Sequence, residues 1–414
     1  MRRRIFYPQV AYFKHCSTKD TSVAETETPK PKKASLLDLS GHPLNKWRKP
    51  SDSIISAEYS RPHRFLDACR DLVKDSTLPI GCVASYFCLP FVGFAGFMHW
   101  ISACLALAAI NRATVVHGFS NRTKKDLTNK NVLVVGTSNL GISTAVQLAE
   151  MNANVFIAGH PERRIPTSEA VAAIAGKDSK LQYLDVDIAD HLSIRTLASQ
   201  VRTNLSSLDV LVHCNLTTHP DLEFVKRSAG GKGNAYEELT LATNFLGPFH
   251  LTERLLPLLE ASEGRVIAAT SRTHQVIVEQ AIARQLLEIK PDDETYQGYR
   301  YFGLSCLGTM SHVKEIAAKH PRVGAACVNV GTVAHGEVTS TPQSVGFMSK
   351  ILAKTGWEAS QSIVNAAVRS DFRSGGYYSD LVLRPHGRSR VANDAKLRDE
   401  IIAWATQHTV KKYT

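Results

Sequence analysis

The stretch "NVLVVGTSNLGISTAVQLA", residues 131–149, decides the fold of this chain. Its first five residues form an apolar run typical of a buried β-strand, and "GISTAVQLA" has the apolar spacing of a helix. Glycines at positions 136 and 141 mark the turn between them. Such a strand, turn and helix can hold a phosphate-containing ligand, because glycines admit its close approach and the helix N-terminus supplies N–H donors.

Strand signals of the same kind recur along the chain: "NVFIAG", "SLDVLVHC", "GRVIAAT" and "GAACVNV". Each is a short apolar run, and helical stretches separate them. Buried strands that alternate with helices form a parallel sheet covered on both faces. The sequence therefore predicts an α/β domain with a Rossmann-type doubly wound parallel sheet over residues 128–414.

The positive charge of the chain lies outside this predicted domain. The formal net charge is +11, but residues 131–414 carry 29 Lys and Arg against 28 Asp and Glu, whereas residues 1–78 carry 15 against 9. A basic folded face would be expected of a nucleic-acid-binding protein. The uneven distribution predicts no nucleic-acid partner.

The N-terminus reads as a targeting segment followed by a polar linker. Residues 1–18 contain three consecutive arginines and no acidic residue, a composition typical of mitochondrial targeting segments. An ordinary basic tail is the alternative, because Pro8 would interrupt an amphipathic helix. Residues 19–78 are rich in Lys, Thr, Ser and Pro, which predicts a linker without a packed core.

Residues 79–111 form a hydrophobic segment that predicts a membrane anchor. Residues 80–110 contain no Asp, Glu, Lys or Arg, and about 20 apolar helical residues suffice to span a bilayer. One tilted helix and a hairpin bent at Pro90 both fit this length, and a buried helix pair is the non-membrane alternative. We expect contact with membrane lipid, in a mitochondrial membrane or alternatively the endoplasmic reticulum membrane.

The eight cysteines predict neither a metal site nor a disulfide framework. They are scattered, with no Cys-x-x-Cys pair and no histidine at ligand spacing. Buried reduced thiols are the expected state, and no metal is predicted.

Four further stretches carry a resemblance to a known family: "LDVDIADHLSIRTLASQV", "TNFLGPFHLTERLLPLL", "GRVIAATSRTH" and "SGGYYSDLVL". In order and spacing they resemble the short-chain dehydrogenase/reductase superfamily, in its retinol dehydrogenase-like and WW-domain oxidoreductase-like branch. The resemblance implies a Rossmann-type domain that uses NAD(P)(H) to interconvert alcohols and carbonyls of lipophilic substrates.

The resemblance also implies a set of cofactor-binding positions, several of which depart from the family pattern. Gly136 and Gly141 match two glycines of the family turn, but Asn139 stands at the third and the turn is one residue shorter. The family's Asn-Asn-Ala-Gly element is replaced by "HCNL", so Asn215 and Leu216 stand where alanine and glycine are expected. The remaining implied contacts are with the adenine ring, by Asp185, and with a 2′-phosphate, by His160. These departures predict no cofactor or a weakly bound one, and NADP(H) if any.

The catalytic positions depart further from the family pattern. Asn244 and Ser271 match the family's asparagine and serine. Counting back from "KEIAAKH" without gaps, Phe302 stands at the tyrosine position and Cys306 at the lysine position. If the register slips by one residue, Tyr301 takes the tyrosine position, but Ser305 then replaces the lysine.

Three functions follow as hypotheses. The first is a catalytically eroded dehydrogenase fold, tethered to a membrane, that serves as a structural or accessory subunit with protein partners in a mitochondrial membrane assembly. The second is an active NADP(H)-dependent oxidoreductase that uses Tyr301 and Ser271. The third is a module that senses a dinucleotide without turning it over.

Overall fold

A computed structural model describes residues 101–102, 106, 120–175, 181–219, 221–225, 237–288, 296–333, 353–384 and 390–409. The predicted targeting segment, the linker and, apart from residues 101–102 and 106, the hydrophobic segment lie outside the described residues. Among the described residues, no helix has both the length and the apolar composition needed to cross a membrane.

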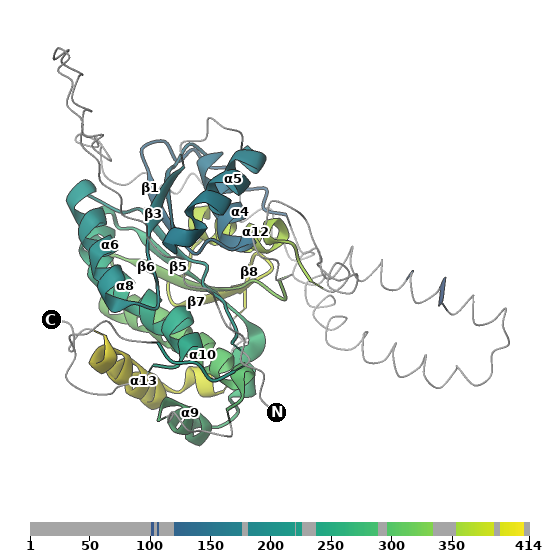
Figure 1. The fold of residues 1–414 in the computed structure, drawn as a ribbon, viewed down its shortest axis with the longest axis vertical. Helices are drawn as coiled ribbons and strands as arrows, with labels where there is room; N and C mark the ends of the chain where they lie inside the picture. Colours follow the sequence, from purple (N-terminus) through teal and green to yellow (C-terminus); the bar gives the residue numbers. More distant parts are fainter. Residues whose placement is uncertain are drawn as a thin grey trace, which may run out of the picture. The chain divides into compact units, whose positions relative to one another are not determined.

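The described chain builds one mixed sheet, which Figure 1 shows at the centre of the domain. The strand order is β3-β2-β1-β4-β5-β6-β7-β8, with parallel pairing except between β7 and β8. The strands are β1 (Asn131–Val135), β2 (Asn154–Gly159), β3 (Gln182–Asp185), β4 (Val210–His213), β5 (Arg265–Thr270), β6 (Gly324–Asn329), β7 (Gly376–Ser379) and β8 (Val382–Leu383). The predicted doubly wound parallel sheet is confirmed, and the antiparallel β8 at its edge was not predicted.

Helices lie between the strands and cover the sheet. The α-helices are α4 (Asn139–Ala149), α5 (Arg164–Ala175), α6 (His191–Asn204), α7 (Leu239–Leu241), α8 (Gly247–Ser262), α9 (Gln280–Leu287), α10 (Gly298–Lys319), α12 (Gly356–Val368) and α13 (Ala395–His408). The shorter turns are η4 (Pro161–Arg163), η5 (Ala242–Leu246), η6 (Arg272–Val276) and η8 (Val391–Asn393), of which η5 is a π-helical turn. Helices α4 and α12 pack together, as do α6 and α8, and α13 lies against α10.

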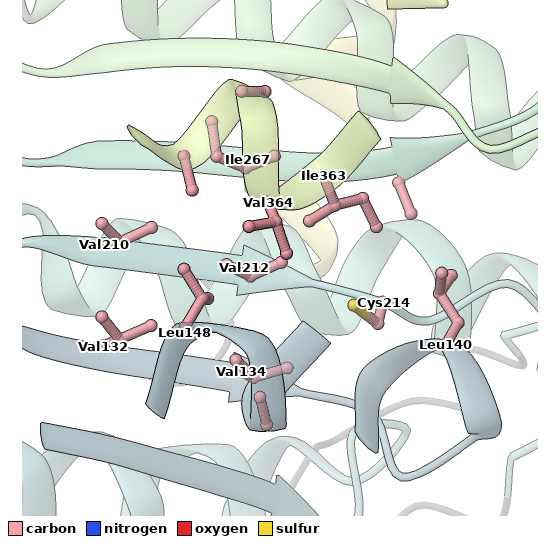
Figure 2. Packing of buried hydrophobic residues seen from close by; sticks show 14 of the residues in the cluster. Val132, Val134, Leu140, Leu148, Val210, Val212, Cys214, Ile267, Ile363 and Val364 are labelled. Carbon is pink, nitrogen blue, oxygen red and sulfur yellow. The ribbon is translucent and has the colours of Figure 1, made fainter. Parts of the chain in front are cut away.

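The core forms because every second residue of a strand points to the same face of the sheet. Val132 and Val134 of β1 enter the same buried cluster as Val210 and Val212 of β4, whereas Leu133 between them is buried outside it. Figure 2 shows these valines packed under side chains of α4 and α12. Strands buried on both faces explain why the sequence shows continuous apolar runs rather than alternation.

The strand order reverses between β1 and β4. The chain leaves β1 toward β2 and β3 on one side, and β4 then continues the sheet on the other side. In open parallel sheets a ligand crevice forms at such a reversal, outside the carboxyl ends of the strands. This edge is therefore where a functional site is expected.

Candidate functional site

A cleft of about 680 Å³ lies at the carboxyl ends of β1, β2 and β4. Its walls come from the turn after β1 (136–138), residues 159–160 at the end of β2, the loop after β3 (186–190) and the loop after β4 (214–217). Clefts of this size are typical of small-molecule and cofactor sites. Four segments that are distant in the sequence therefore meet at the strand-order reversal.

The turn after β1 depends on its two glycines. Gly136 has a φ of +116°, a backbone conformation that side chains disfavour, and it lines the cleft. A Cβ at Gly141 would overlap the Gly136 carbonyl oxygen and lie 2.8 Å from the carbonyl carbon. Both glycines match their predicted place in the turn, but Gly141 supports the turn from within α4 rather than lining the cleft.

Asn139, which stands at the position of the third glycine of the family turn, does not line the cleft. It is the exposed first residue of α4 and lies against the start of α12, where a Cβ at Gly356 would come within 2.5 Å of the Asn139 backbone. Ser138, the preceding residue, lines the cleft instead.

Of the two aspartates in "LDVD", Asp187 lines the cleft and Asp185 does not. Asp185 is the last residue of β3 and forms two hydrogen bonds with the Arg164 guanidinium, at 3.2 and 2.5 Å. The Asp187 carboxylate accepts a hydrogen bond from the Ala189 N–H at 3.0 Å, which shapes the loop. The sequence "LDVD" holds two acids that share a strand face, so the pattern could not separate them.

The end of β2 places basic groups at the cleft, as predicted for His160. The His160 ring accepts a hydrogen bond from the Glu162 N–H at 3.4 Å at the start of η4. Arg163, the last residue of η4, also lines the cleft and is half-buried. The Asp185 carboxylate, at the end of β3, is paired with the Arg164 guanidinium. Its negative charge is therefore already compensated and does not act on His160 or Arg163 at this wall.

The end of β4 contributes one residue whose acceptor is unsatisfied. Asn215 lines the cleft, and its buried Oδ1 has no hydrogen-bond partner within the described part of the chain. A buried acceptor without a donor costs free energy, so a donor supplied by a ligand would stabilise it. Leu216 also lines the cleft, but it packs against the apolar cluster of Figure 2. The cleft therefore persists beside Leu216, which stands where the family pattern has glycine.

His213, just before these residues, is buried and neutral. Thr252 donates its hydroxyl hydrogen to the Pro248 carbonyl oxygen at 2.8 Å, so the same oxygen accepts from His213 Nε2 at 2.8 Å. Burial lowers the pKa of His213 to about 3, and the charge of His312 acts in the same direction. A ring held neutral in this way is a poor proton donor near pH 7.

Asn244 lies in the π-helical turn η5, and protein groups occupy both ends of its amide. Its Oδ1 accepts from the Thr217 N–H at 2.9 Å, and its Nδ2 donates to the Thr217 carbonyl oxygen at 2.7 Å. The same Nδ2 donates to Ser305 Oγ at 3.3 Å. Asn244 therefore ties the loop after β4 to α10.

Ser271 follows β5 and caps the short turn η6. Its Oγ accepts from the Thr273 N–H at 3.3 Å and shares a hydrogen bond of 2.9 Å with the Thr273 hydroxyl. His274 contacts the Ser271 carbonyl oxygen through Nδ1 at 2.7 Å. Ser271 does not line the described cleft, so the predicted catalytic and cofactor positions form two adjoining regions.

Helix α10 presents Gly303 to this Ser271 turn and directs Tyr301 elsewhere. A Cβ at Gly303 would lie 2.8 Å from the Thr273 carbonyl oxygen. Two residues correspond to about 200° around a helix, so Tyr301 lies on the opposite face. There its buried ring stacks on Tyr296, with centroids 4.8 Å apart. The alternative register, in which Tyr301 serves Ser271, therefore does not match the structure.

Cys306 and Phe302 lie nearer the Gly303 face. Cys306 is about 60° from Gly303 around the helix, and its thiol meets the Ser271 backbone. Burial raises the pKa of this thiol to about 11, and hydrogen bonding to the Ser271 backbone lowers it only in part. A neutral, 1%-exposed thiol carries no charge that could activate a phenol. Phe302 is half-buried and offers no proton.

A buried lysine near this region, Lys354, does not replace the missing cation. Its side chain passes Gly331, where a Cβ would lie 3.4 to 3.7 Å from it, and its Nζ donates to Asp380 at 2.8 Å. Both side chains are less than a tenth exposed. The charge of Lys354 is therefore already paired within the fold. Within the described ranges, no group of His, Cys, Asp and Glu is arranged to hold a metal ion.

Comparisons with known proteins show what this chain is similar to. The short chain dehydrogenase family pattern matches residues 130–283. Bovine retinol dehydrogenase 12 is 27% identical over 277 residues, which cover 63% of this chain and 80% of that protein. Human dehydrogenase/reductase SDR family member 13 is 26% identical over 211 residues, 49% of this chain and 50% of that protein.

Other matches are shorter or more distant. An uncharacterized oxidoreductase of Schizosaccharomyces pombe is 32% identical over 135 residues, 32% of this chain and 38% of that protein. The chain thus spans half or less of the length of some curated relatives. Among solved structures, an alcohol dehydrogenase from Thermococcus sibiricus complexed with 5-hydroxy-NADP is 14% identical, with a TM-score of 0.44 and coverage of 63% of this chain and 99% of that one.

The matched part of this chain, residues 130–283, belongs to the short-chain dehydrogenase/reductase superfamily. Its homologues include retinol dehydrogenase 12 and dehydrogenase/reductase SDR family member 13.

Proposed function

We propose that this chain is a catalytically inactive member of the superfamily that holds an NADP-type dinucleotide in its cleft without turning it over. The observation that carries the proposal is the pair of residues on α10. Phe302 stands where the proton donor is expected, and Cys306, where the cation is expected, is a buried neutral thiol. A positioned acid or base accounts for about 10² to 10⁴ in rate, and neither residue can supply one.

The retained cleft supports the nucleotide part of the proposal. Gly136 of the glycine turn lines the cleft without a side chain, and the buried Asn215 Oδ1 has no hydrogen-bond partner among the described residues. His160 and Arg163 would meet a 2′-phosphate, which favours NADP(H) over NAD(H). Arg164 neutralises Asp185, so that acid would not repel the phosphate. When bound, a dinucleotide of this kind supplies a hydride acceptor or donor.

We expect full-length protein to bind NADP⁺ but to show no turnover of retinoid, steroid or fatty alcohols and aldehydes. The rate should lie about 10² to 10⁴-fold below that of bovine retinol dehydrogenase assayed in parallel, because the acid/base group is missing. NADP⁺ at 100 times its dissociation constant should stabilise the fold by about 2.7 kcal/mol, measured by thermal denaturation. Turnover that Ser271→Ala abolishes would contradict inactivity, and the lack of any thermal shift with millimolar NADP(H) would contradict binding.

The two neighbouring acids give a matched pair of variants for the binding site. Asp187→Asn keeps the acceptor that shapes the loop but removes the charge from the cleft, so NADP⁺ affinity should fall about 10-fold, the worth of one charged hydrogen bond. Asp185→Asn weakens only a half-exposed pair with Arg164, which is worth about 1 kcal/mol or less. Its affinity, measured by calorimetry, should stay within about threefold. A larger loss of affinity in Asp185→Asn than in Asp187→Asn would assign the adenine contact to Asp185.

We further propose that the protein is tethered to a mitochondrial membrane and acts there as an accessory or structural subunit. The basic leader and the uncharged segment 79–111 support this setting. The experiment is fractionation of tagged full-length protein, followed by carbonate extraction and native electrophoresis. Recovery in the soluble fraction, or migration as a lone chain, would refute it.

A further inference from the structure

Three buried polar side chains and the partly buried Arg254 form a continuous hydrogen-bonded chain beside the cleft. Arg254 Nε donates to His250 Nε2 at 2.6 Å, His250 Nδ1 meets His191 Nδ1 at 2.9 Å, and His191 Nε2 meets Glu237 Oε2 at 3.0 Å. His250 is fully buried, and the His191 and Glu237 side chains are 5% and 1% exposed. The chain joins α8, α6 and the residue that precedes the cap of α7.

The chemistry of Arg254 and Glu237, the two ends of this hydrogen-bonded series, fixes the position of every proton between them. A guanidinium can only donate and a carboxylate can only accept. His250 Nε2 must therefore be the acceptor, which places the proton of the neutral ring on Nδ1. That proton is donated to His191 Nδ1, so the His191 proton lies on Nε2 and points to Glu237. All three bonds run in one direction, from Arg254 to Glu237.

An additional proton on either ring breaks one of these bonds. If His191 is protonated, two N–H groups face each other across the 2.9 Å Nδ1–Nδ1 contact. If His250 moves its own proton to Nε2 to avoid this, that proton faces the Arg254 N–H. The arrangement is therefore compatible with neutral histidines only.

Glu237 connects this chain to the wall of the cleft. Its carbonyl oxygen accepts from the Val225 N–H at 3.0 Å, and the Leu239 N–H donates to the Glu223 carbonyl oxygen at 2.9 Å. Val225 and Leu239 both line the cleft. On the other side, His191 follows Asp190, which lines the cleft and caps α6. The four-residue chain thus holds one wall of the cleft against α6 and α8.

We propose that this histidine chain is a pH-sensitive lock on the cleft wall, closed at neutral pH and released in acid. Its consequence for ligand affinity rests on the proposed nucleotide binding, whereas the lock itself does not. Release frees the Glu237 side chain, and the hydrogen bond between the Val225 N–H and the Glu237 carbonyl oxygen is then weakened. Dinucleotide affinity should then fall as the pH decreases.

The surrounding charges set the direction of the response. Arg195, Arg202 and Arg254 form a positive group on α6 and α8, and Asp190 and Glu237 are the acids near the two rings. Burial lowers the pKa of His250 to about 3, with His191, Arg254 and Arg195 acting in the same direction. The locked form therefore rejects a proton, while an opened, hydrated histidine accepts one near pH 6.5. Below that pH the open form gains population.

Hydrogen exchange tests the lock in full-length protein without any ligand. The amides of Val225 and Leu239 are followed by mass spectrometry at pH 7.5 and 5.5, after correction for the intrinsic pH dependence of exchange. Each histidine that titrates on opening should lower protection about 10-fold at pH 5.5, so wild type should lose between about 10- and 100-fold. His250→Gln, which can still accept and donate but does not titrate, should lose about 10-fold less.

His312→Gln is the matched control, because the buried His312 on α10 pairs at 3.0 Å with the partly exposed Glu253 on α8, and neither residue lines the cleft. It should respond as wild type does. An identical pH response in wild type and His250→Gln would overturn the proposal, as would an equal loss of response in His312→Gln. If His250→Gln does not fold, nitrogen NMR of histidine-labelled wild type decides. The lock requires His250 protonated on Nδ1 and His191 on Nε2 at pH 7.5, and any other assignment refutes it.

Calorimetry with NADP⁺ at both pH values separates this proposal from the proposed function. Release of Val225 in acid without binding at either pH would support the lock and refute nucleotide binding. Binding of equal affinity at both pH values, with unchanged protection of Val225, would refute the lock and support nucleotide binding. Binding that weakens in acid for wild type but less for His250→Gln supports both.

Discussion

Lowering the pH from 7.5 to 5 is expected to reduce the free energy of unfolding by about 4 kcal/mol. The cause is the pair His213 and His250, whose pKa values burial lowers to about 3. The unfolded chain, with histidine pKa values near 6.5, binds more protons, so stability is full above pH 6.5 and is lost as the pH falls. Each histidine contributes about 1.4 kcal/mol per pH unit in this range. Because pH 5 lies well above both folded values, the result depends little on them.

Urea denaturation of full-length protein at a series of pH values measures this loss. His213→Gln and His250→Gln should each remove about half of it, although each will also lower stability at neutral pH by disturbing a buried hydrogen bond. His160→Gln is the control, because nearly half of the His160 side chain is exposed in the folded chain. A total loss below about 1 kcal/mol, or one unchanged in both variants, would show that these rings are not held neutral.

Gly141→Ala is expected to destabilise the fold by about 3 kcal/mol or more, and to abolish NADP⁺ binding. The added methyl group would overlap the Gly136 carbonyl oxygen, and a backbone carbonyl in a tight turn has little room to move. Gly136 has positive φ and is itself packed against the Cys214 backbone, which a Cβ at Gly136 would approach to 3.2 Å. The turn is thus confined on both sides.

Denaturant unfolding and calorimetry with NADP⁺ would test both parts of this expectation. Ser138→Ala in the same turn is the control: the residue is exposed and its side chain makes no capping bond to α4, so stability should change by less than about 0.5 kcal/mol. A Gly141→Ala protein within 1 kcal/mol of wild type would mean that the turn can open to accept the methyl group.

The fold could be predicted from the sequence because strands buried on both faces leave uninterrupted apolar runs. "NVLVV" and "GAACVNV" correspond to β1 and β6. The edge strand β8 has only two residues, which is too short for a periodic signal. The glycine turn could also be predicted, because only glycine tolerates such contact between backbones.

Individual site residues were harder to predict, for geometric reasons. Asp185 and Asp187 share strand parity, and only the end of β3 at Asp185 determines which one reaches the cleft. Tyr301 and Phe302 are adjacent, but about 100° of helix rotation separates them. The histidine chain leaves no local pattern at all, because His191 and His250 are 59 residues apart and meet only where α6 packs on α8.

The close approach of Gly141 to Gly136 separates two kinds of structural requirement. Gly141 is required for folding, since a side chain there disrupts the turn whether or not a nucleotide binds. Ser138, Arg163 and Asp187 line the cleft, so substitutions at these positions would change the cleft and leave the contact between the two glycines intact. The glycines of the turn therefore indicate how the chain folds, and the side chains around the cleft determine what it can hold.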